Sequence, residues 1–125
     1  MLNSKNALAT IAVKSVKDAR RFYGEVLGLK VEESGEPSVL DVRSGETSML
    51  VYESQFAGTN QATAATWIVG RDLDAIVATL KERGVTFEHY DFPGTTRKGD
   101  IHEAGSTRVA WLKDPDGNIL SLVNG

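Results

Sequence analysis

The chain has 125 residues, of which 41% are hydrophobic and 25% charged, a composition typical of one globular domain in water. Its net charge of −3 excludes a general attraction to nucleic acids or anionic membranes. Cysteine is absent, which excludes disulfides, thiolate nucleophiles and cysteine-ligated zinc. No apolar run reaches the length of a membrane span, and the first residues lack the apolar core of a signal peptide, so we expect a cytoplasmic protein.

The first half of the chain predicts one strand, one helix and three further strands. Residues 7–13 form a short apolar run that predicts the first strand. Ser15 is a good N-cap for a helix over residues 15–27, and Gly28 is a good stop after it. The remaining predicted strands of this half cover residues 30–33, 39–43 and 47–52.

The second half repeats this order. A strand over residues 65–69 precedes a helix that begins at the cap Asp72 and ends before Gly84. Strands over residues 86–89, 109–113 and 119–123 follow, with a long excursion over residues 91–107. We therefore predict two tandem βαβββ modules, residues 1–56 and 65–125, joined by a linker over residues 57–64. A single irregular α+β domain with two helices is the alternative.

The last two predicted strands are joined by the tight turn Asp-Pro-Asp-Gly-Asn at residues 114–118. Proline presets φ, the aspartates bond to the nearby backbone, and Gly117 tolerates a positive φ. Because apolar runs flank this turn on both sides, the sequence predicts a closing β-hairpin.

In its order and spacing this set of segments resembles the vicinal-oxygen-chelate superfamily, which includes glyoxalase I, extradiol dioxygenases, and fosfomycin and bleomycin resistance proteins. The segments that carry the resemblance are ATIAV (9–13), ARRFY (19–23), VLGL (26–29), DLDA (72–75) and DPDGN (114–118). The resemblance implies an α+β fold in which two tandem βαβββ modules form U-shaped curved sheets with helices outside. It also implies a homodimer.

Metal enzymes of this family bind a divalent cation through one side chain from each of four strands. The resemblance places those ligands at Leu8, Leu50, Ala65 and Ser121, of which only Ser121 offers a donor atom, and a poor one. We therefore expect no metal and no other cofactor. A relocated metal site near His89, His102 and Glu103 is the alternative, against two ordinary surface histidines.

If the family's ligand positions face a groove, strand alternation identifies the other side chains that line it. The predicted lining is mostly apolar with two aromatic walls and suits an apolar or aromatic small molecule. It consists of Leu8, Thr10, Ser48, Leu50, Tyr52, Ala65, Trp67 and Ser121. The alternative is that these side chains fill the groove themselves.

The excursion over residues 91–107 is long enough to act as a lid over a binding site. Its functional candidates are Tyr90, Arg97, His102 and Arg108. His102 is the only candidate acid or base inside the excursion, because its ordinary pKa lies near neutrality. Arg97 suits an anionic ligand or is simply an exposed cation.

Three functions fit these observations. The first is a metal-independent protein that binds an unknown small molecule, and the second is a lyase, isomerase or dioxygenase-type enzyme with a relocated metal or histidine-based catalysis. The third is a structural subunit with a filled groove. Whether the chain is an enzyme stays open at this point, although the missing ligands argue against glyoxalase I and dioxygenase activity.

Overall fold

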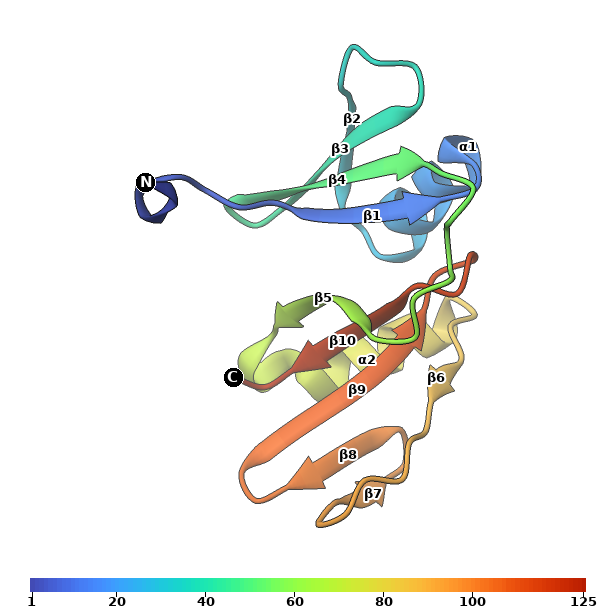
Figure 1. Cartoon of the computed structure of the whole chain (residues 1–125). Coiled ribbons are helices and arrows are strands. Elements are labelled where there is room, and N and C mark those ends of the chain that lie inside the picture. The colour runs from blue at the N-terminus through green and yellow to red at the C-terminus, as the bar shows by residue number, and fades with distance from the viewer. The chain divides into compact units, whose positions relative to one another are not determined.

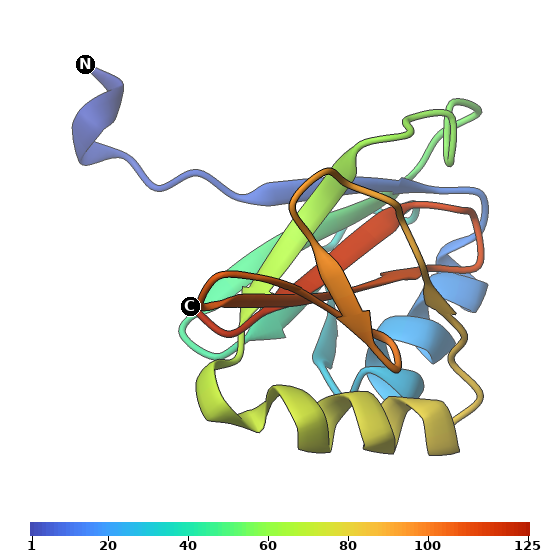
Figure 2. The ribbon, with the colours of Figure 1, turned by 90° about the horizontal axis from the view of Figure 1, so that it is seen from below.

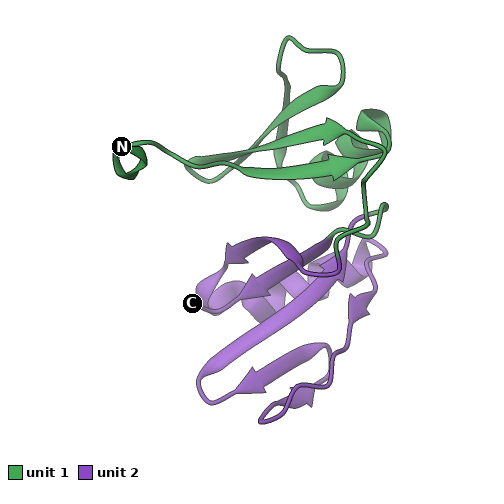
Figure 3. Cartoon of the chain, viewed as in Figure 1, with its two compact units in different colours: residues 1–60, 115–118 green, residues 61–114, 119–125 purple.

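A computed structural model describes all residues from Met1 to Gly125 and divides them into two compact units (Figure 3). Unit 1 contains Met1–Asn60 together with Pro115–Asn118, and unit 2 contains Gln61–Asp114 together with Ile119–Gly125. Each unit holds one open sheet and its own helical segment, so the chain has the predicted α+β class with a duplicated plan. No helix in the chain has the length and apolar character that crossing a membrane requires.

The sheet of unit 1 has the order β1-β4-β3-β2 (Figure 1). β1 is parallel to β4, and the other two pairings are antiparallel. After a single 3-10 turn, η1 (Leu2–Ser4), the elements are β1 (Ala9–Val13), α1 (Val16–Ala19), η2 (Arg20–Val26), β2 (Lys30–Glu33), β3 (Val39–Ser44) and β4 (Thr47–Glu53).

The helical segment of unit 1 begins as predicted but changes its winding. The Ser15 hydroxyl accepts a hydrogen bond from the Asp18 N–H at 3.4 Å, which caps α1. From Arg20 onward the segment is a π-helix, closed by a hydrogen bond from the Leu27 N–H to the Phe22 carbonyl at 2.9 Å. Such i→i+5 turns are rare in proteins, and propensity alone does not distinguish them from an α-helix.

The core of unit 1 lies between this helical segment and one face of the sheet. Phe22 and Tyr23 of η2 are buried and meet edge to face, with ring centroids 5.1 Å apart. The sheet residues that are almost fully buried are Ile11, Val13, Leu40, Val42 and Val51. They alternate along their strands, so their neighbours form a second, open face.

The sheet of unit 2 has the order β5-β10-β9-β8-β7, and β6 also pairs with β9. β5 is parallel to β10, as β1 is to β4, so the second unit repeats the first. Its elements are β5 (Thr63–Ile68), η3 (Gly70–Asp72), α2 (Leu73–Glu82), β6 (Phe87–Glu88), β7 (Thr96–Lys98), β8 (Ile101–Ala104), β9 (Thr107–Lys113) and β10 (Ile119–Val123).

α2 lies along one face of the unit 2 sheet (Figure 2) and buries Leu73, Val77 and Leu80. The helix begins after Asp72, as predicted, but the Asp72 side chain makes no capping hydrogen bond. A 3-10 turn precedes it and leads the chain from β5 into the helix. Gly84 follows the helix with φ +91°, the left-handed conformation expected of a glycine stop.

The predicted excursion over residues 91–107 is not a plain loop. β7 and β8 form an antiparallel hairpin within it, and β8 pairs with one end of β9. β6 pairs with the other end of the same β9 edge. The segment therefore extends the sheet, because its backbone groups find partners there, whereas its role as a lid over a binding site stays a prediction.

Candidate functional site

Four rings gather on the open face of the unit 2 sheet, and we call them the aromatic cluster: Tyr90, Phe92, His102 and Trp111. The Trp111 ring centroid lies 4.8 Å from that of His102, 5.2 Å from that of Tyr90 and 5.5 Å from that of Phe92. The Trp111 ring meets the rings of both His102 and Tyr90 at 75°, the edge-to-face geometry that aromatic quadrupoles favour.

Strand register brings these rings together. His102 of β8 pairs with Val109 of β9, so it shares a face with Trp111 two residues further on. Glu88 of β6 pairs directly with Trp111. Tyr90 follows two residues after Glu88 and so arrives beside the same ring.

His102 is buried, and its one hydrogen bond indicates which ring nitrogen carries the proton. Its side chain is 2% exposed, and its Nε2 atom accepts a hydrogen bond from the Tyr90 N–H at 3.0 Å. An Nε2 that accepts carries no proton, so the proton of the neutral ring is on Nδ1. The Nδ1 atom is itself buried and has no hydrogen-bond partner.

Tyr90 presents a second buried polar atom without a partner, its phenolic oxygen. Burial raises the pKa of Tyr90 above its ordinary value of 10.0, and the charge of Glu88 raises it further while Lys113 lowers it. The phenol is therefore protonated at neutral pH and can donate a hydrogen bond.

Both residues border a cavity of about 370 Å³ in unit 2. Its volume lies within the range of small-molecule sites. The Arg97 Nη1 atom donates to the Gly99 carbonyl at 2.8 Å and lies 3.4 Å from Nε2 of His89. The lining residues are Tyr90, Asp91, Phe92, Pro93, Thr95, Thr96, Arg97 and His102.

A charged group in the turn between β7 and β8 holds this hairpin against the helix α2. Asp100 accepts from Lys81 of α2 and from His89, each at 2.8 Å. The Lys81 contact first, and then that of His89, lowers the pKa of the Asp100 carboxyl below its usual 3.8. The ion pair between Asp100 and Lys81 therefore joins the β7–β8 turn to α2.

The residues of the alternative metal site are engaged elsewhere. Nε2 of His89 bonds to Asp100, and Nε2 of His102 accepts from the backbone. Glu103 bonds to Arg108, and as the neighbour of His102 in β8 it lies on the opposite face. No group of three histidine, aspartate or glutamate side chains in the chain is placed to hold a metal ion.

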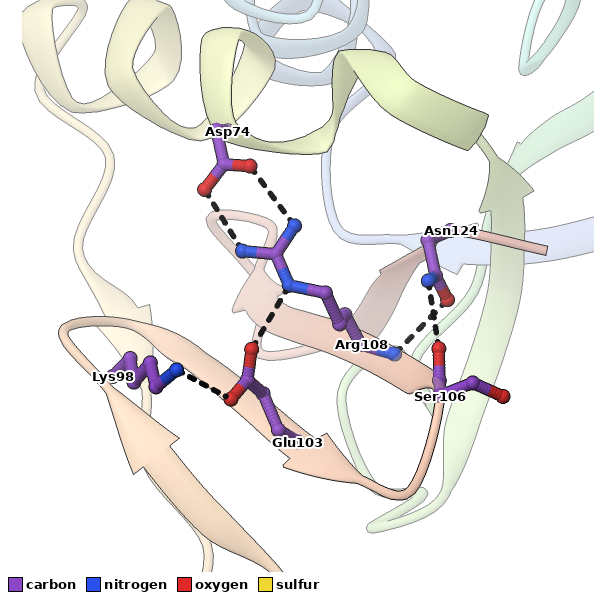
Figure 4. Close-up of polar contacts among 6 residues, drawn as sticks. All are labelled: Asp74, Lys98, Glu103, Ser106, Arg108 and Asn124. Atoms are coloured by element: carbon purple, nitrogen blue, oxygen red, sulfur yellow. Dashed lines mark hydrogen bonds and ion pairs between the residues drawn. The ribbon is translucent and has the colours of Figure 1, made fainter.

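Arg108, one of the residues predicted for the lid, lies in β9 and forms ion pairs with Asp74 and Glu103. Its guanidinium donates to both carboxylate oxygens of Asp74 in α2 at 2.9 Å, and to Glu103 at 3.1 Å (Figure 4). The same contacts lower the pKa of Asp74 and raise that of Arg108. Lys98 pairs with Glu103 at 3.4 Å, so the network fastens the sheet to α2 on the face away from the aromatic cluster.

On the first sheet, the predicted groove residues lie on the open face. Thr10 of β1 pairs with Leu50 of β4, and Tyr52 follows on the same side at 38% exposure. Ser48 shares this face by alternation, whereas Leu8 lies just before β1 and is 46% exposed.

The same face carries two charged residues that the sequence prediction missed. Asp41 pairs with Leu50, and Arg43 pairs with Ser48. Alternation in the strand over residues 39–43 was the signal that identifies them. The open face of the first sheet is therefore more polar than predicted.

On the second sheet, the predicted facing of β5 was wrong. Ala65 and Trp67 pair with Leu120 and Leu122, so they share the face that packs under α2. Thr66 instead pairs with Ser121, and their hydroxyl oxygens are 2.6 Å apart. An irregularity between Ile119 and Leu120 sets this register, and a shift of one residue turns every side chain to the other face.

The positions where the resemblance places the family's metal ligands do not suit a cation. Leu50 has no donor atom, and the Ser121 hydroxyl is 4% exposed and shares its hydrogen bond with Thr66. A divalent ion of this family is bound by imidazole and carboxylate groups, and none of these positions carries either group.

A model of the Glyoxalase/Bleomycin resistance protein/Dioxygenase superfamily matches residues 6–122. The chain therefore belongs to this superfamily, as its motifs predicted. No curated protein matches it.

Among solved structures, the fosfomycin resistance protein FosX from Listeria monocytogenes is 14% identical, with a TM-score of 0.66 over 96% of this chain and 90% of that one. Lactoylglutathione lyase from Agrobacterium tumefaciens is 13% identical, with a TM-score of 0.68 over 95% and 92%. The oxidase ChaP-H2 is 22% identical, with a TM-score of 0.67 over 97% and 94%. These likenesses establish the shared fold.

Proposed function

We propose that this protein binds a small aromatic molecule without the help of a metal, in the cavity beside the aromatic cluster of unit 2. The observation that carries the proposal is that this cavity of about 370 Å³ is bordered by Tyr90, Phe92 and His102. A pocket with aromatic walls and a few polar groups is the usual form of a site for a flat ligand.

The exposure of the cluster supports this function. Phe92 is 48% exposed although it contacts both Tyr90 and Trp111, so one of its faces is left for a ligand ring. Offset or edge-to-face contacts between rings contribute about 0.5–1.5 kcal/mol beyond the area that they bury. A ligand ring on Phe92 would extend contacts that the protein has already arranged.

The metal-independent part of the proposal rests on the donor groups. Of the four positions where the family resemblance places metal ligands, Leu8, Leu50 and Ala65 have no donor atom, and the buried Ser121 hydroxyl shares its hydrogen bond with Thr66. A site built from hydroxyls and aromatic rings binds by shape and hydrogen bonding instead.

A second candidate function is catalysis by His102 without a metal, of the lyase or isomerase kind. His102 is the one histidine that borders the cavity, and its Nδ1 proton is unpartnered. General acid–base catalysis requires such a group within hydrogen-bond reach of the substrate. Turnover of a bound carbonyl compound that is lost in His102→Gln would favour this candidate over simple binding.

The test is a titration of the full chain with benzyl alcohol, a neutral aromatic probe, in buffer containing EDTA. We expect amide shifts in two-dimensional NMR to concentrate at residues 90–97, 102 and 111. Phe92→Ala should weaken binding. The control Phe56→Ala removes another exposed phenylalanine ring (68% exposed) that does not line the cavity, and it should leave binding unchanged.

Binding that requires added Zn²⁺ or Mn²⁺ would refute the metal-independent function. Shifts confined to Thr10, Leu50 and Tyr52 would move the site to the open face of unit 1, where the sequence predicted a groove.

A further inference from the structure

Two buried polar atoms point to the chemistry of the ligand. Nδ1 of His102 and the phenolic oxygen of Tyr90 are both buried without a partner, and both residues border the same cavity. Their rings are stacked at 29°, with centroids 6.5 Å apart, so the two side chains are neighbours at the cavity. A buried donor without a partner destabilises the folded state, so two such atoms beside one cavity require an explanation.

Hydrogen-bonding roles decide what can satisfy these atoms. Because Nε2 of His102 already accepts the Tyr90 N–H, Nδ1 is a donor in the neutral ring and also in the charged one. The Tyr90 phenol is protonated and can donate as well. Two donors together accommodate an oxygen with several lone pairs and disfavour an amine.

A cation lies at the same cavity. Arg97 is exposed and borders it, and its hydrogen bonds use only the Nη1 end of the guanidinium. Asp91 also lines the cavity and is exposed, and its negative charge weakens the attraction for an anion. The two donor atoms are buried, the charged residues are exposed, and Phe92 offers a ring face.

Resting on the proposed function, we propose that the cavity takes an aromatic carboxylate, whose oxygens accept from His102 Nδ1–H and Tyr90 Oη–H while its ring lies on Phe92. The carboxylate would turn two unsatisfied donors into charge-assisted hydrogen bonds, which are about twice as strong as neutral ones.

The experiment compares benzoate, benzyl alcohol and benzylamine on the full chain by NMR titration at pH 7.5. The chain has two histidines, so the ring nitrogens of His102 can be assigned against His89 alone. We expect benzoate to bind about tenfold more tightly than benzyl alcohol, and benzylamine to bind more weakly than either. The Nδ1 signal of His102 should shift with benzoate and keep its protonated form.

Two variants remove one donor each. His102→Met keeps only a weak sulfur acceptor for the Tyr90 N–H and removes the Nδ1 donor, and Tyr90→Phe removes only the hydroxyl. Each should weaken benzoate binding more than benzyl alcohol binding, and so abolish most of the preference for benzoate. The matched control His89→Met removes a histidine that does not border the cavity, and it should keep the preference.

The outcomes separate the two proposals. Benzyl alcohol binding with no gain for benzoate, or a gain that survives both variants, overturns the carboxylate assignment and leaves the proposed function in place. If neither probe binds at the cluster, the proposed function itself fails, and with it this inference. If only one of the two variants folds, the preference for benzoate measured with that variant is sufficient to test the carboxylate assignment.

Discussion

Replacing Gly58 by alanine tests the packing of unit 1 at its most crowded backbone contact. A Cβ atom at Gly58 would lie 1.8 Å from the backbone oxygen of Asp116, far below the 3.0 Å that real Cβ contacts respect. The two segments would therefore have to separate by at least 1.2 Å, the difference between 3.0 and 1.8 Å. Gly58 also has φ +72°, which alanine adopts only with strain.

The size of the effect follows from three contributions. The left-handed backbone costs about 1–2 kcal/mol for a residue with a Cβ. Displacing Asp116 disturbs the hydrogen bond that its carboxylate accepts from the Lys14 N–H at 3.1 Å, worth about 1 kcal/mol. Forced overpacking adds about 1–3 kcal/mol. We expect a total loss of about 3–6 kcal/mol in the free energy of unfolding.

Gly45 provides a matched control in the same unit. It has φ +57°, but a Cβ there would meet nothing within 4 Å. Gly45→Ala should therefore lose only the backbone contribution of about 1–2 kcal/mol. In thermal unfolding followed by circular dichroism, we expect Gly58→Ala to lower the Tm by about 12–24 °C and Gly45→Ala by about 4–8 °C. Equal losses in the two variants would refute the close approach of residues 58 and 116.

Three further predictions concern unit 2. Thr66→Val leaves the buried Ser121 hydroxyl without its partner and should cost about 1–2 kcal/mol in urea unfolding, whereas Thr66→Ser should cost little; no difference between them would contradict the hydroxyl pair. Asp100→Asn should be less stable than the parent at pH 7, because the folded pKa of this carboxyl lies below 3.8. Its stabilisation is present above the unfolded pKa and lost as the pH falls through the folded one, so the difference between parent and variant should shrink as the pH falls below 3.8; a difference independent of pH would rule out Lys81 and His89 as its cause. Arg108→Lys removes the bidentate hydrogen bonds to Asp74 of α2, so it should lower the Tm slightly in low salt and less in high salt. A decrease in Tm that is the same at both salt concentrations would indicate a loss of packing instead.

The repeat and most element positions could be predicted from the sequence because their signals are local. Ser15 caps its helix through its own side chain, and Gly84 ends the second helix with a positive φ. Strand alternation separates the open face of the first sheet, with the predicted Thr10 and Leu50, from the buried face with Ile11 and Val13. Each of these features depends on residues within one turn or one strand of each other.

The prediction of which β5 side chains face the groove required counting residues from the helix cap back to the strand. It was wrong because that spacing differs between the two modules. The prediction assumed equal spacing between strand and helix in both modules. In unit 2, the 3-10 turn Gly70–Asp72 lies between β5 and α2, and the register of β5 on β10 is irregular. No residue near Ala65 signals either feature, so Trp67 was assigned to the wrong face.

The aromatic cluster was found only in part. Tyr90 and His102 were predicted as site residues, but Phe92 and Trp111 were not. The missing step was the β7–β8 hairpin, whose turn Gly99-Asp100 joins the paired residues Lys98 and Ile101. A Gly-Asp pair between short strands is a recognised hairpin signal, and it would have placed His102 in a sheet.

The closing hairpin has a consequence for how the chain acquires its structure in time. Its tip, Pro115–Asn118, belongs to unit 1 and bonds to β1 and the residue after it, from Asn118 to the Ala12 carbonyl at 2.7 Å and from the Lys14 N–H to Asp116. These partners are 106 and 102 residues apart in sequence. During synthesis, the strands of unit 1 are translated early. Its contacts with residues 115–118 form only after residue 118 has been translated. Such distant contacts slow folding, and they make the two units depend on each other for completion even though each has its own core.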